Sequence, residues 1–248
     1  MSKIIWIDVG THFAQEHKFI FGSNTYFYRF LLKRFIGGKI LKRGKFVKFS
    51  ELKNIINYRK EIRKRSNKFF SIFIEANPKI AFKENFYPKA DMFFNLALTD
   101  KNYPSASIAK LFVGNGGDYS EGNTLFKKKF NSQPLKYIPT LGVSVDTFFK
   151  SLEAYLSEKF NNYRLILRLN CEGVEDEVIY SVHEIFDKKL ILIAGSLKDV
   201  EEIKGESAFN KLLSYMKSNQ LKFIKFSSGI DTWQEASKSI CKVLMEDI

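Results

Sequence analysis

The sequence predicts an α/β fold in which helices cover both faces of a mostly parallel sheet. Three observations lead to this prediction. Short apolar runs of strand length alternate along the chain with segments of helical period. The apolar run from Lys3 to Ile7 is followed by an acid, a glycine and a second small residue, as the first strand of a nucleotide-binding sheet commonly is. The chain has 248 residues and 45% hydrophobic residues, enough for one packed core.

The first strand, Lys3–Val9, continues directly into the loop Asp8–Ala14. Gly10 would allow a tight turn and a close approach of the backbone to a ligand, and the small Ala14 would let the next helix pack near the strand. This pattern is typical of the start of a Rossmann-like sheet and indicates a nucleotide-like ligand.

We expect seven strands in all. They are Lys3–Val9, Phe69–Ile74, Ala90–Leu98, Ile108–Val113, Tyr163–Leu169, Lys189–Ala194 and Leu221–Phe226.

Helices are expected between these strands and after the last one. They are Lys79–Asn85, Thr147–Phe160, Glu175–Phe186, Ala208–Ser218 and Thr232–Met245. The helix from Thr147 places Phe148, Phe149 and Leu152 on one face, and Asp146 is its expected N-cap. Gly114–Asn123, rich in Gly, Asn, Asp and Ser, is expected to be a loop.

The distance between the first two strands predicts an insertion. Asp8 and Glu75 lie 67 positions apart, whereas a simple βαβ unit spans about 30 residues. We therefore expect one domain, residues 1–248, with a basic helical insertion at about residues 20–66. Lys33–Arg65 holds 13 basic and two acidic residues, so 13 − 2 = +11 of the net charge of +13 lies in this segment.

Four interpretations of the insertion stay open, because it interleaves aromatic with basic residues from Tyr26 onwards. It is a lid that closes over the ligand and binds an anionic substrate, or a peripheral contact with an anionic membrane through residues 26–65. The third interpretation, which is less favoured, is a surface that binds nucleic acid. The fourth is a solvated helical hairpin. Five of the eight arginines lie between Arg34 and Arg65, which favours contact with phosphate or carboxylate groups.

Composition argues against several other classes of protein. The apolar runs are too short to span a membrane, and the first strand leaves no room for a signal peptide. Cys171 and Cys241 suggest no disulfide framework, and His12 and His17 are poorly spaced for a metal, so no metal site is expected. We expect a cytoplasmic protein, with a peripheral position at the inner membrane face as one alternative.

The carboxyl ends of the predicted strands indicate where a ligand would bind. They carry Asp8 and Gly10, Glu75, Asn95–Ala97, and Asn170–Gly173. A carboxylate after the second strand can accept hydrogen bonds from both hydroxyls of a ribose, and Glu75 fits that role. The alternative is that Glu75 is a solvated acid that caps the helix beginning near Pro78.

At five places the chain resembles the FkbM family of S-adenosylmethionine-dependent methyltransferases. The resemblance runs over nearly the whole length and is most distinctive in the last segment. The five segments are Ile7–Thr11, Phe73–Pro78, Asn95–Asp100, Val143–Phe148 and Leu167–Glu175.

The resemblance implies a class I methyltransferase sheet, S-adenosylmethionine as cofactor, and a sugar hydroxyl of a surface polysaccharide or glycan precursor as acceptor. In that reading the Asp8–Ala14 loop would hold the methionine part, Glu75 the ribose, and Leu96 with Ala97 the adenine. The implied acceptor is a glycan or a sugar phosphate. The residues expected to bind the cofactor are Asp8, Gly10, Thr11, His12, Ala14, Glu75, Asn77, Leu96 and Ala97.

The chain departs from the family pattern at four positions. His12 and Ala14 stand where the family usually has Asn and Gly, and Arg168 and Asn170 stand where it has Lys and Asp. Asn170 cannot act as a general base, so Glu172 or His12 becomes the candidate. The candidate catalytic residues are Glu172, Asn170, His12 and Arg168.

Three alternatives to this reading stay open. Glu172 and Gly173 also fit a plain strand-to-helix turn. The protein could be a nucleic-acid methyltransferase that uses the basic insertion as its grip. It could also be a catalytically inactive scaffold at a membrane surface.

Overall fold

The central feature of the fold is a six-stranded sheet in which every described pair of neighbouring strands is parallel. The computed structural model describes residues 2–12, 14–39, 49–82, 90–114, 123–130, 136–225 and 238–239. The strand order is β3-β2-β1-β7-β8-β9. These strands are β1 (Lys3–Val9), β2 (Phe69–Ile74), β3 (Met92–Phe94), β7 (Tyr163–Leu169), β8 (Leu190–Gly195) and β9 (Phe223–Lys225).

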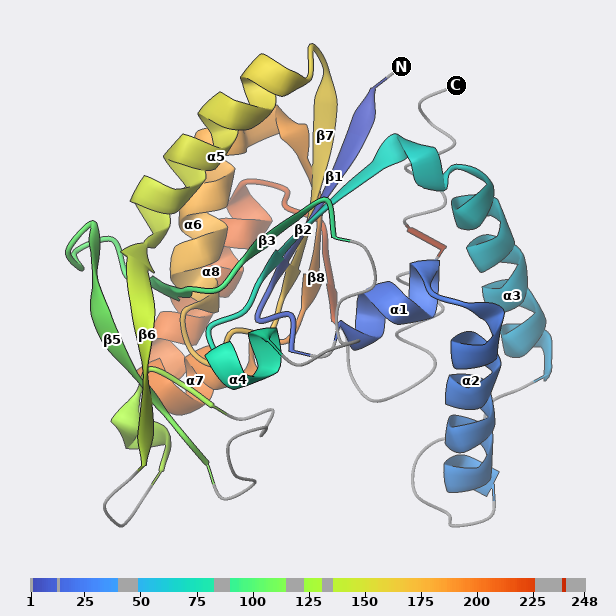
Figure 1. The fold of residues 1–248 in the computed structure, drawn as a ribbon, viewed down its shortest axis with the longest axis horizontal. Helices are drawn as coiled ribbons and strands as arrows, with labels where there is room; N and C mark the ends of the chain where they lie inside the picture. The colour runs from blue at the N-terminus through green and yellow to red at the C-terminus, as the bar shows by residue number, and fades with distance from the viewer. Residues whose placement is uncertain are drawn as a thin grey trace.

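Helices cover both faces of this sheet, which gives three layers (Figure 1). One face carries α5 (Val145–Lys159), α6 (Glu175–Phe186), α7 (Lys198–Lys204) and α8 (Glu206–Ser218). The other face carries α1 (Gln15–Phe21), α2 (Asn24–Lys39) and α3 (Phe49–Lys64). The short helix α4 (Pro78–Ala81) follows β2 at the edge where the carboxyl ends of the strands lie.

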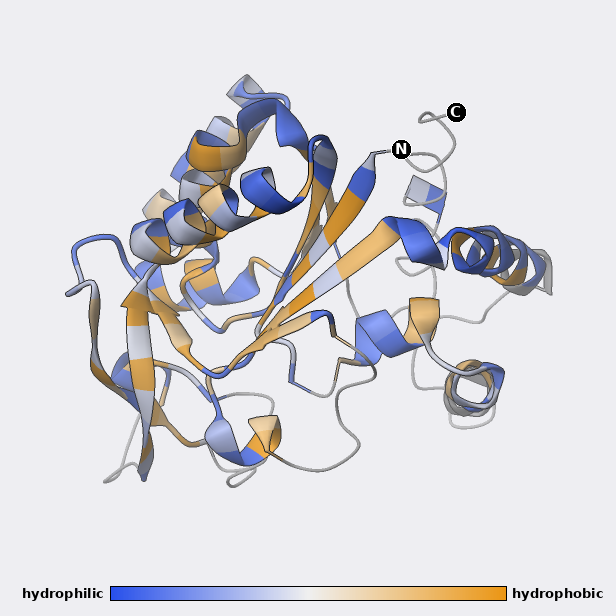
Figure 2. Cartoon of the chain, turned by 45° about the horizontal axis from the view of Figure 1, so that its top comes forward, coloured by the Kyte–Doolittle hydropathy of each residue, from blue (hydrophilic) through white to orange (hydrophobic). Residues whose placement is uncertain are grey.

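Two apolar clusters fill the spaces between the layers, and the strands are hydrophobic between helices whose outer sides are hydrophilic (Figure 2). On the α5/α6 side, Leu165 and Leu167 of β7 pack with Phe149 of α5 and Ile179 of α6. The expected helix beginning at Thr147 is therefore confirmed as α5. Its N-cap is Ser144 and not Asp146, because the Thr147 backbone N–H donates to Ser144 Oγ at 3.4 Å.

On the opposite side, the α2/α3 part of the insertion is packed into the core. Phe27 and Leu31 of α2 and Ile55 and Ile62 of α3 are buried in the same cluster as Trp6 of β1. Residues 40–48, between the two helices, lie outside the described part. Two helices, α2 and α3, thus lie between β1 and β2 in the chain, and their buried apolar side chains cover one face of the sheet.

A second, three-stranded sheet lies beside the first, with the order β4-β6-β5. Its strands are β4 (Ala97–Thr99), β5 (Ala106–Phe112) and β6 (Tyr137–Ser144). The predicted third strand, Ala90–Leu98, is wrong in this respect: it divides into β3 in the central sheet and β4 in the second sheet. The strand expected at Ile108–Val113 is β5, which pairs antiparallel with β6, a strand that the sequence did not predict.

The remaining expectations are met in part. β1, β2, β7 and α6 have the predicted bounds, whereas α8 begins two residues earlier and β9 is shorter than predicted. The central sheet has six strands in the described residues, not the seven expected. Most of the Gly114–Asn123 loop, the end of the predicted Lys79–Asn85 helix and nearly all of Thr232–Met245 lie outside the described residues.

Candidate functional site

The turn after β1 needs a glycine because two loops touch there. Gly10 has φ of +70°, and a Cβ at this position would lie 2.0 Å from the carbonyl oxygen of Asn170. The loops that follow β1 and β7 are therefore in direct backbone contact. The predicted close approach of Gly10 to a ligand stays a prediction, since the close contact seen here is with a neighbouring loop.

Thr11 joins this turn to β2. Its Oγ1 donates to the carbonyl oxygen of Asp8 at 2.8 Å and accepts from the backbone N–H of Ile74 at 3.2 Å. Thr11 is buried, as is Ala14, which has a left-handed conformation at the N-cap of α1. Both residues shape the loop.

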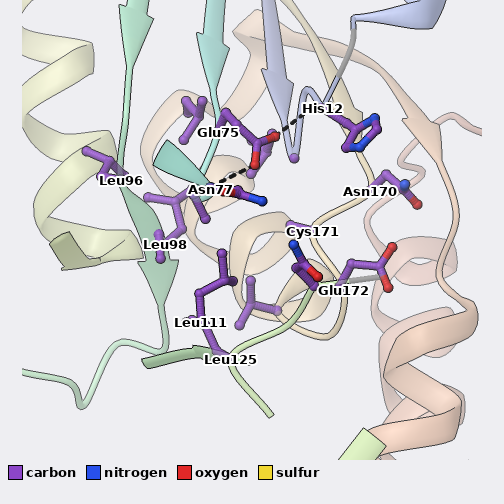
Figure 3. Close-up of a pocket in the computed structure, with 17 residues that line it drawn as sticks. His12, Glu75, Asn77, Leu96, Leu98, Leu111, Leu125, Asn170, Cys171 and Glu172 are labelled. Carbon is purple, nitrogen blue, oxygen red and sulfur yellow. Dashed lines mark hydrogen bonds between the residues drawn. The ribbon is translucent and has the colours of Figure 1, made fainter. Parts of the chain in front are cut away.

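Glu75 follows β2 and directs its carboxylate into the space at the strand ends (Figure 3). Its Oε2 accepts from the backbone N–H of His12 at 2.6 Å, and its Oε1 accepts from that of Asn77 at 2.8 Å. Burial raises the pKa of Glu75 from 4.5 to about 7, against the lowering effect of these two hydrogen bonds. The alternative that Glu75 caps α4 is wrong, because Asn77 is the N-cap and accepts from the Lys79 N–H.

These residues line what we call the strand-end pocket, which contains about 580 Å³ of empty space, the part open to solvent included. It combines backbone and polar groups after β1, β2 and β7 with an apolar wall built from both sheets. Its lining residues are Val9, Gly10, His12, Ile74, Glu75, Ala76, Asn77, Leu96, Ala97, Leu98, Leu111, Asn123, Leu125, Asn170, Cys171, Glu172 and Val174.

The strand-end pocket brings together eight of the twelve residues predicted for the site: Gly10, His12, Glu75, Asn77, Leu96, Ala97, Asn170 and Glu172. Thr11 and Arg168 line a smaller adjoining pocket of about 290 Å³, which shares His12 and Asn170 with the first. Asp8 and Ala14 line neither.

Asp8 forms a buried ion pair beneath the strand-end pocket. Its Oδ1 lies 3.0 Å from Nη1 of Arg168, the residue opposite it in the register of β1 and β7. Arg168 also pairs with Glu16 at 2.9 Å and donates to the carbonyl oxygen of Gly10 at 2.7 Å. Burial raises the pKa of Asp8 to about 6, although the Arg168 charge opposes this shift. In this arrangement both residues support the Gly10 turn from below.

Glu175 organises the loop after β7, a role that the sequence did not predict. Its carboxylate accepts from the backbone N–H groups of Cys171, Glu172 and Gly173 at 2.8–3.0 Å. Glu172 and Gly173 both have positive φ, which this inward-facing carboxylate stabilises. Burial raises the pKa of Glu175 to about 7. An acid two residues after a loop glycine, at a helix start, was the available signal.

The side chain of Glu172 pairs with Lys129, which also pairs with Asp199 at the start of α7. These two carboxylates raise the pKa of Lys129, although its partial burial acts in the opposite direction. Glu172 is therefore held by a cation at one edge of the pocket. Neither Lys129 nor the apolar wall from Leu98, Leu111 and Leu125 was predicted, because each depends on contacts distant in sequence.

The other histidines lie away from the pocket. The ring of His17 is buried, its Nε2 lies 3.0 Å from Ser71 Oγ, and burial lowers its pKa to about 3. Nδ1 of His183 lies 2.6 Å from the Tyr215 hydroxyl. Within the described residues, no group of three or more His, Cys, Asp or Glu side chains could hold a metal ion. None of the helices described is both long and apolar enough to cross a bilayer.

Comparison with known proteins adds no relative: no family model matches this chain, and no curated protein or solved structure is significantly similar to it. The resemblance to FkbM methyltransferases therefore rests on the five short segments alone.

Proposed function

We propose that this protein is an S-adenosylmethionine-dependent O-methyltransferase that acts on a sugar hydroxyl of a surface polysaccharide or a glycan precursor, and that its sheet is a variant of the class I methyltransferase sheet. One observation carries the proposal: the buried carboxylate of Glu75, at the end of β2, faces a pocket whose opposite wall is apolar. The glycan acceptor comes from the family resemblance.

The chemistry of the pocket fits the nucleoside part of the cofactor. Each oxygen of Glu75 accepts one backbone N–H group, and each keeps a second lone pair that could accept from a ribose hydroxyl. Leu96, Leu98 and Leu111 offer an apolar surface of the kind that an adenine ring needs.

The polar end of the pocket suits the reacting groups. Bound there, S-adenosylmethionine would supply an electrophilic methyl group. His12, Asn170 and Glu172 lie at this end, where they could orient an acceptor hydroxyl. His12 or Glu172 would take the hydroxyl proton, and Asn170 would donate or accept a hydrogen bond without titrating. Positioning of the acceptor would supply most of the rate enhancement.

Isothermal titration calorimetry with S-adenosylmethionine tests the cofactor half. The wild type is expected to bind, and Glu75→Gln is expected to bind about tenfold or more weakly, because hydrogen bonds to a charged acceptor contribute about 1.5–3 kcal/mol. Glu184→Gln, an exposed change of the same chemistry on α6, is the control and should bind as the wild type does. Absence of binding by the wild type would sink the proposal.

The pH dependence of the same titration is a second test. Ribose hydroxyls donate to the ionised form of Glu75, so binding should release a proton from a carboxyl group whose pKa is about 7. Affinity should therefore rise as the pH rises from 6 to 8 in the wild type, and Glu75→Gln should lose most of this rise. Equal pH profiles would mean that Glu75 does not contact the cofactor.

A further inference from the structure

The α2/α3 hairpin contains a second pocket, which we call the hairpin pocket. It contains about 910 Å³ of empty space, the part open to solvent included, and shares no lining residue with the strand-end pocket. Residues near the start of α2 and along the second half of α3 form its walls. They are Asn24, Phe27, Tyr28, Ile56, Arg59, Lys60, Arg63 and Lys64.

The charge of this lining is one-sided. Four of the eight residues are basic and none is acidic. Lys64 pairs with Glu61 at 2.7 Å, but no described carboxylate lies within ion-pair distance of Arg59, Lys60 or Arg63. Arg59 is buried, whereas Lys60 and Arg63 are exposed beside it. A buried charge usually has a counter-charge. Since none of the described carboxylates provides one here, this group of three cations favours a bound anion.

Arg59 makes this arrangement rigid. The residue is only 5% exposed, and its guanidinium lies 4.4 Å from the centre of the Phe27 ring. It donates to the carbonyl oxygen of Phe19 in the last turn of α1, to that of Gly22 just after the helix, and to Asn24 Oδ1 at 2.9 Å. The position of this charge is thus fixed by the fold.

Arg63 is held beside it by the same acceptor. Its Nη1 donates to Asn24 Oδ1 at 2.6 Å, so one amide oxygen holds two guanidinium groups together. Burial, and next the nearby charge of Arg63, lower the pKa of Arg59 to about 10. This repulsion is present in the protein alone, and an anion placed between the basic groups would offset it.

We propose that the hairpin pocket binds the phosphate group of a phosphomonoester ligand. Arg63 and Lys60 direct hydrogen-bond donors to the phosphate, and Arg59 adds fixed positive charge behind them. A phosphate carries more charge and more acceptor oxygens than a carboxylate, so it matches several cations better. The proposal does not depend on the methyltransferase assignment.

The pocket also has room and surface for the rest of such a ligand. Its volume exceeds that of a phosphate ion. Tyr28, which is 54% exposed, offers an aromatic ring to the rest of the ligand, and Ile56 offers an aliphatic side chain. A phosphorylated sugar and the head group of a phosphorylated lipid both present this chemistry. The test separates these two sources.

Binding should be measured on the full chain with matched probes. Glucose 1-phosphate represents the soluble source, with glucose as its uncharged control. Vesicles of phosphatidylcholine with phosphatidic acid represent the lipid source, with pure phosphatidylcholine vesicles as their control. The wild type should bind at least one phosphomonoester probe and neither control.

The variant Lys60→Gln/Arg63→Gln removes two charges and leaves the hydrogen bonds from Arg59 to the end of α1 in place. It should bind the phosphomonoester probe at least about tenfold more weakly, because it removes charge-assisted hydrogen bonds to the phosphate. Lys211→Gln/Lys217→Gln removes two charges from the exposed surface of α8 and should bind as the wild type does. An unchanged circular dichroism melting curve shows that each variant is folded.

Two results with these probes would overturn the proposal: no binding of either phosphomonoester probe, or equal weakening by both double variants. A third would be that Lys60→Gln/Arg63→Gln loses binding to a single-stranded RNA probe but keeps its binding to the phosphomonoester. Binding of S-adenosylmethionine should be unaffected by Lys60→Gln/Arg63→Gln. The two proposals therefore fail independently.

Discussion

The same strands present two different faces to the two helical layers. Towards α5 and α6, the buried side chains of β1, β2 and β7 are apolar, apart from the Tyr163 hydroxyl at the start of β7, which accepts from Lys189. Towards α1, α2 and α3, each of these strands also contributes one buried polar side chain: Asp8 from β1, Ser71 from β2 and Arg168 from β7. Two of these three stand near the carboxyl ends of their strands, directly below the Gly10 turn.

This difference indicates a division of roles. Apolar packing on the α5/α6 face supplies most of the burial that holds the sheet. On the other face, the Asp8–Arg168 pair and its bond to the Gly10 carbonyl fix the register of two strands and the shape of one loop. A buried ion pair is weak evidence for added stability, but removing only one of its two partners is costly because the other charge is left unpaired.

The largest expected effect comes from removing one partner of this pair. Arg168→Leu leaves Asp8 and Glu16 without their cation, and we expect it to lower the free energy of unfolding by about 3–5 kcal/mol at pH 8. The loss should be smaller at pH 5, because Asp8, whose pKa is already raised to about 6, is then protonated. Urea denaturation at the two pH values measures both effects.

The double variant Asp8→Asn/Arg168→Leu is the control for this interpretation. It should recover part of the lost stability at pH 8, since no uncompensated charge remains at position 8. A double variant less stable than Arg168→Leu would mean that Asp8 contributes mainly through hydrogen bonds.

The next effect concerns the two glutamates with raised pKa values, Glu75 and Glu175. In the folded protein they bind their protons up to about pH 7, whereas the unfolded chain releases them near pH 4.5. Their contribution to the free energy of unfolding should therefore fall as the pH rises from 4.5 to 7. Denaturation across this range, with Glu175→Gln for comparison, should show a shallower fall in the variant.

Glu175→Gln should also be less stable at neutral pH by about 1–3 kcal/mol, because an amide nitrogen then faces the N–H groups that the carboxylate accepted. The melting temperature at pH 7 measures this loss. No destabilisation would mean that the loop after β7 keeps its shape without Glu175.

The smallest effect is expected on the apolar face. Ile179→Val in α6 removes one fully buried methylene group and should cost about 1 kcal/mol. Because no titrating group is involved, the cost should be the same at pH 5 and pH 8. A pH-dependent cost would contradict the division between the faces.

The sequence was sufficient for the parts of the fold that depend on local pattern. β1, β2 and β7 were predicted with their bounds because each is a largely apolar run that ends at glycine or polar residues. The second sheet was missed because β6 contains Pro139 and Gly142 and is stabilised by β5, about thirty residues away. The splitting of Ala90–Leu98 likewise depends on which neighbouring strand each half meets.

The site shows the same limit at the level of single residues. Asp8 and Glu75 both follow the pattern of an acid at a strand end, yet only Glu75 faces the strand-end pocket. What separates them is the pairing of β1 with β7, which brings Arg168 opposite Asp8. That pairing joins residues 160 positions apart, so no local pattern could reveal it.

The contacts of Arg59 have a consequence for how the insertion moves. Separating α3 from the end of α1 would break several hydrogen bonds and expose Phe27, Leu31, Ile55 and Ile62 to water. Local opening at such a cost is rare, so the amide hydrogens in the buried turns around Ile55–Ile62 should exchange with solvent about as slowly as those of β1. The hairpin would then unfold together with the sheet, as part of one cooperative unit.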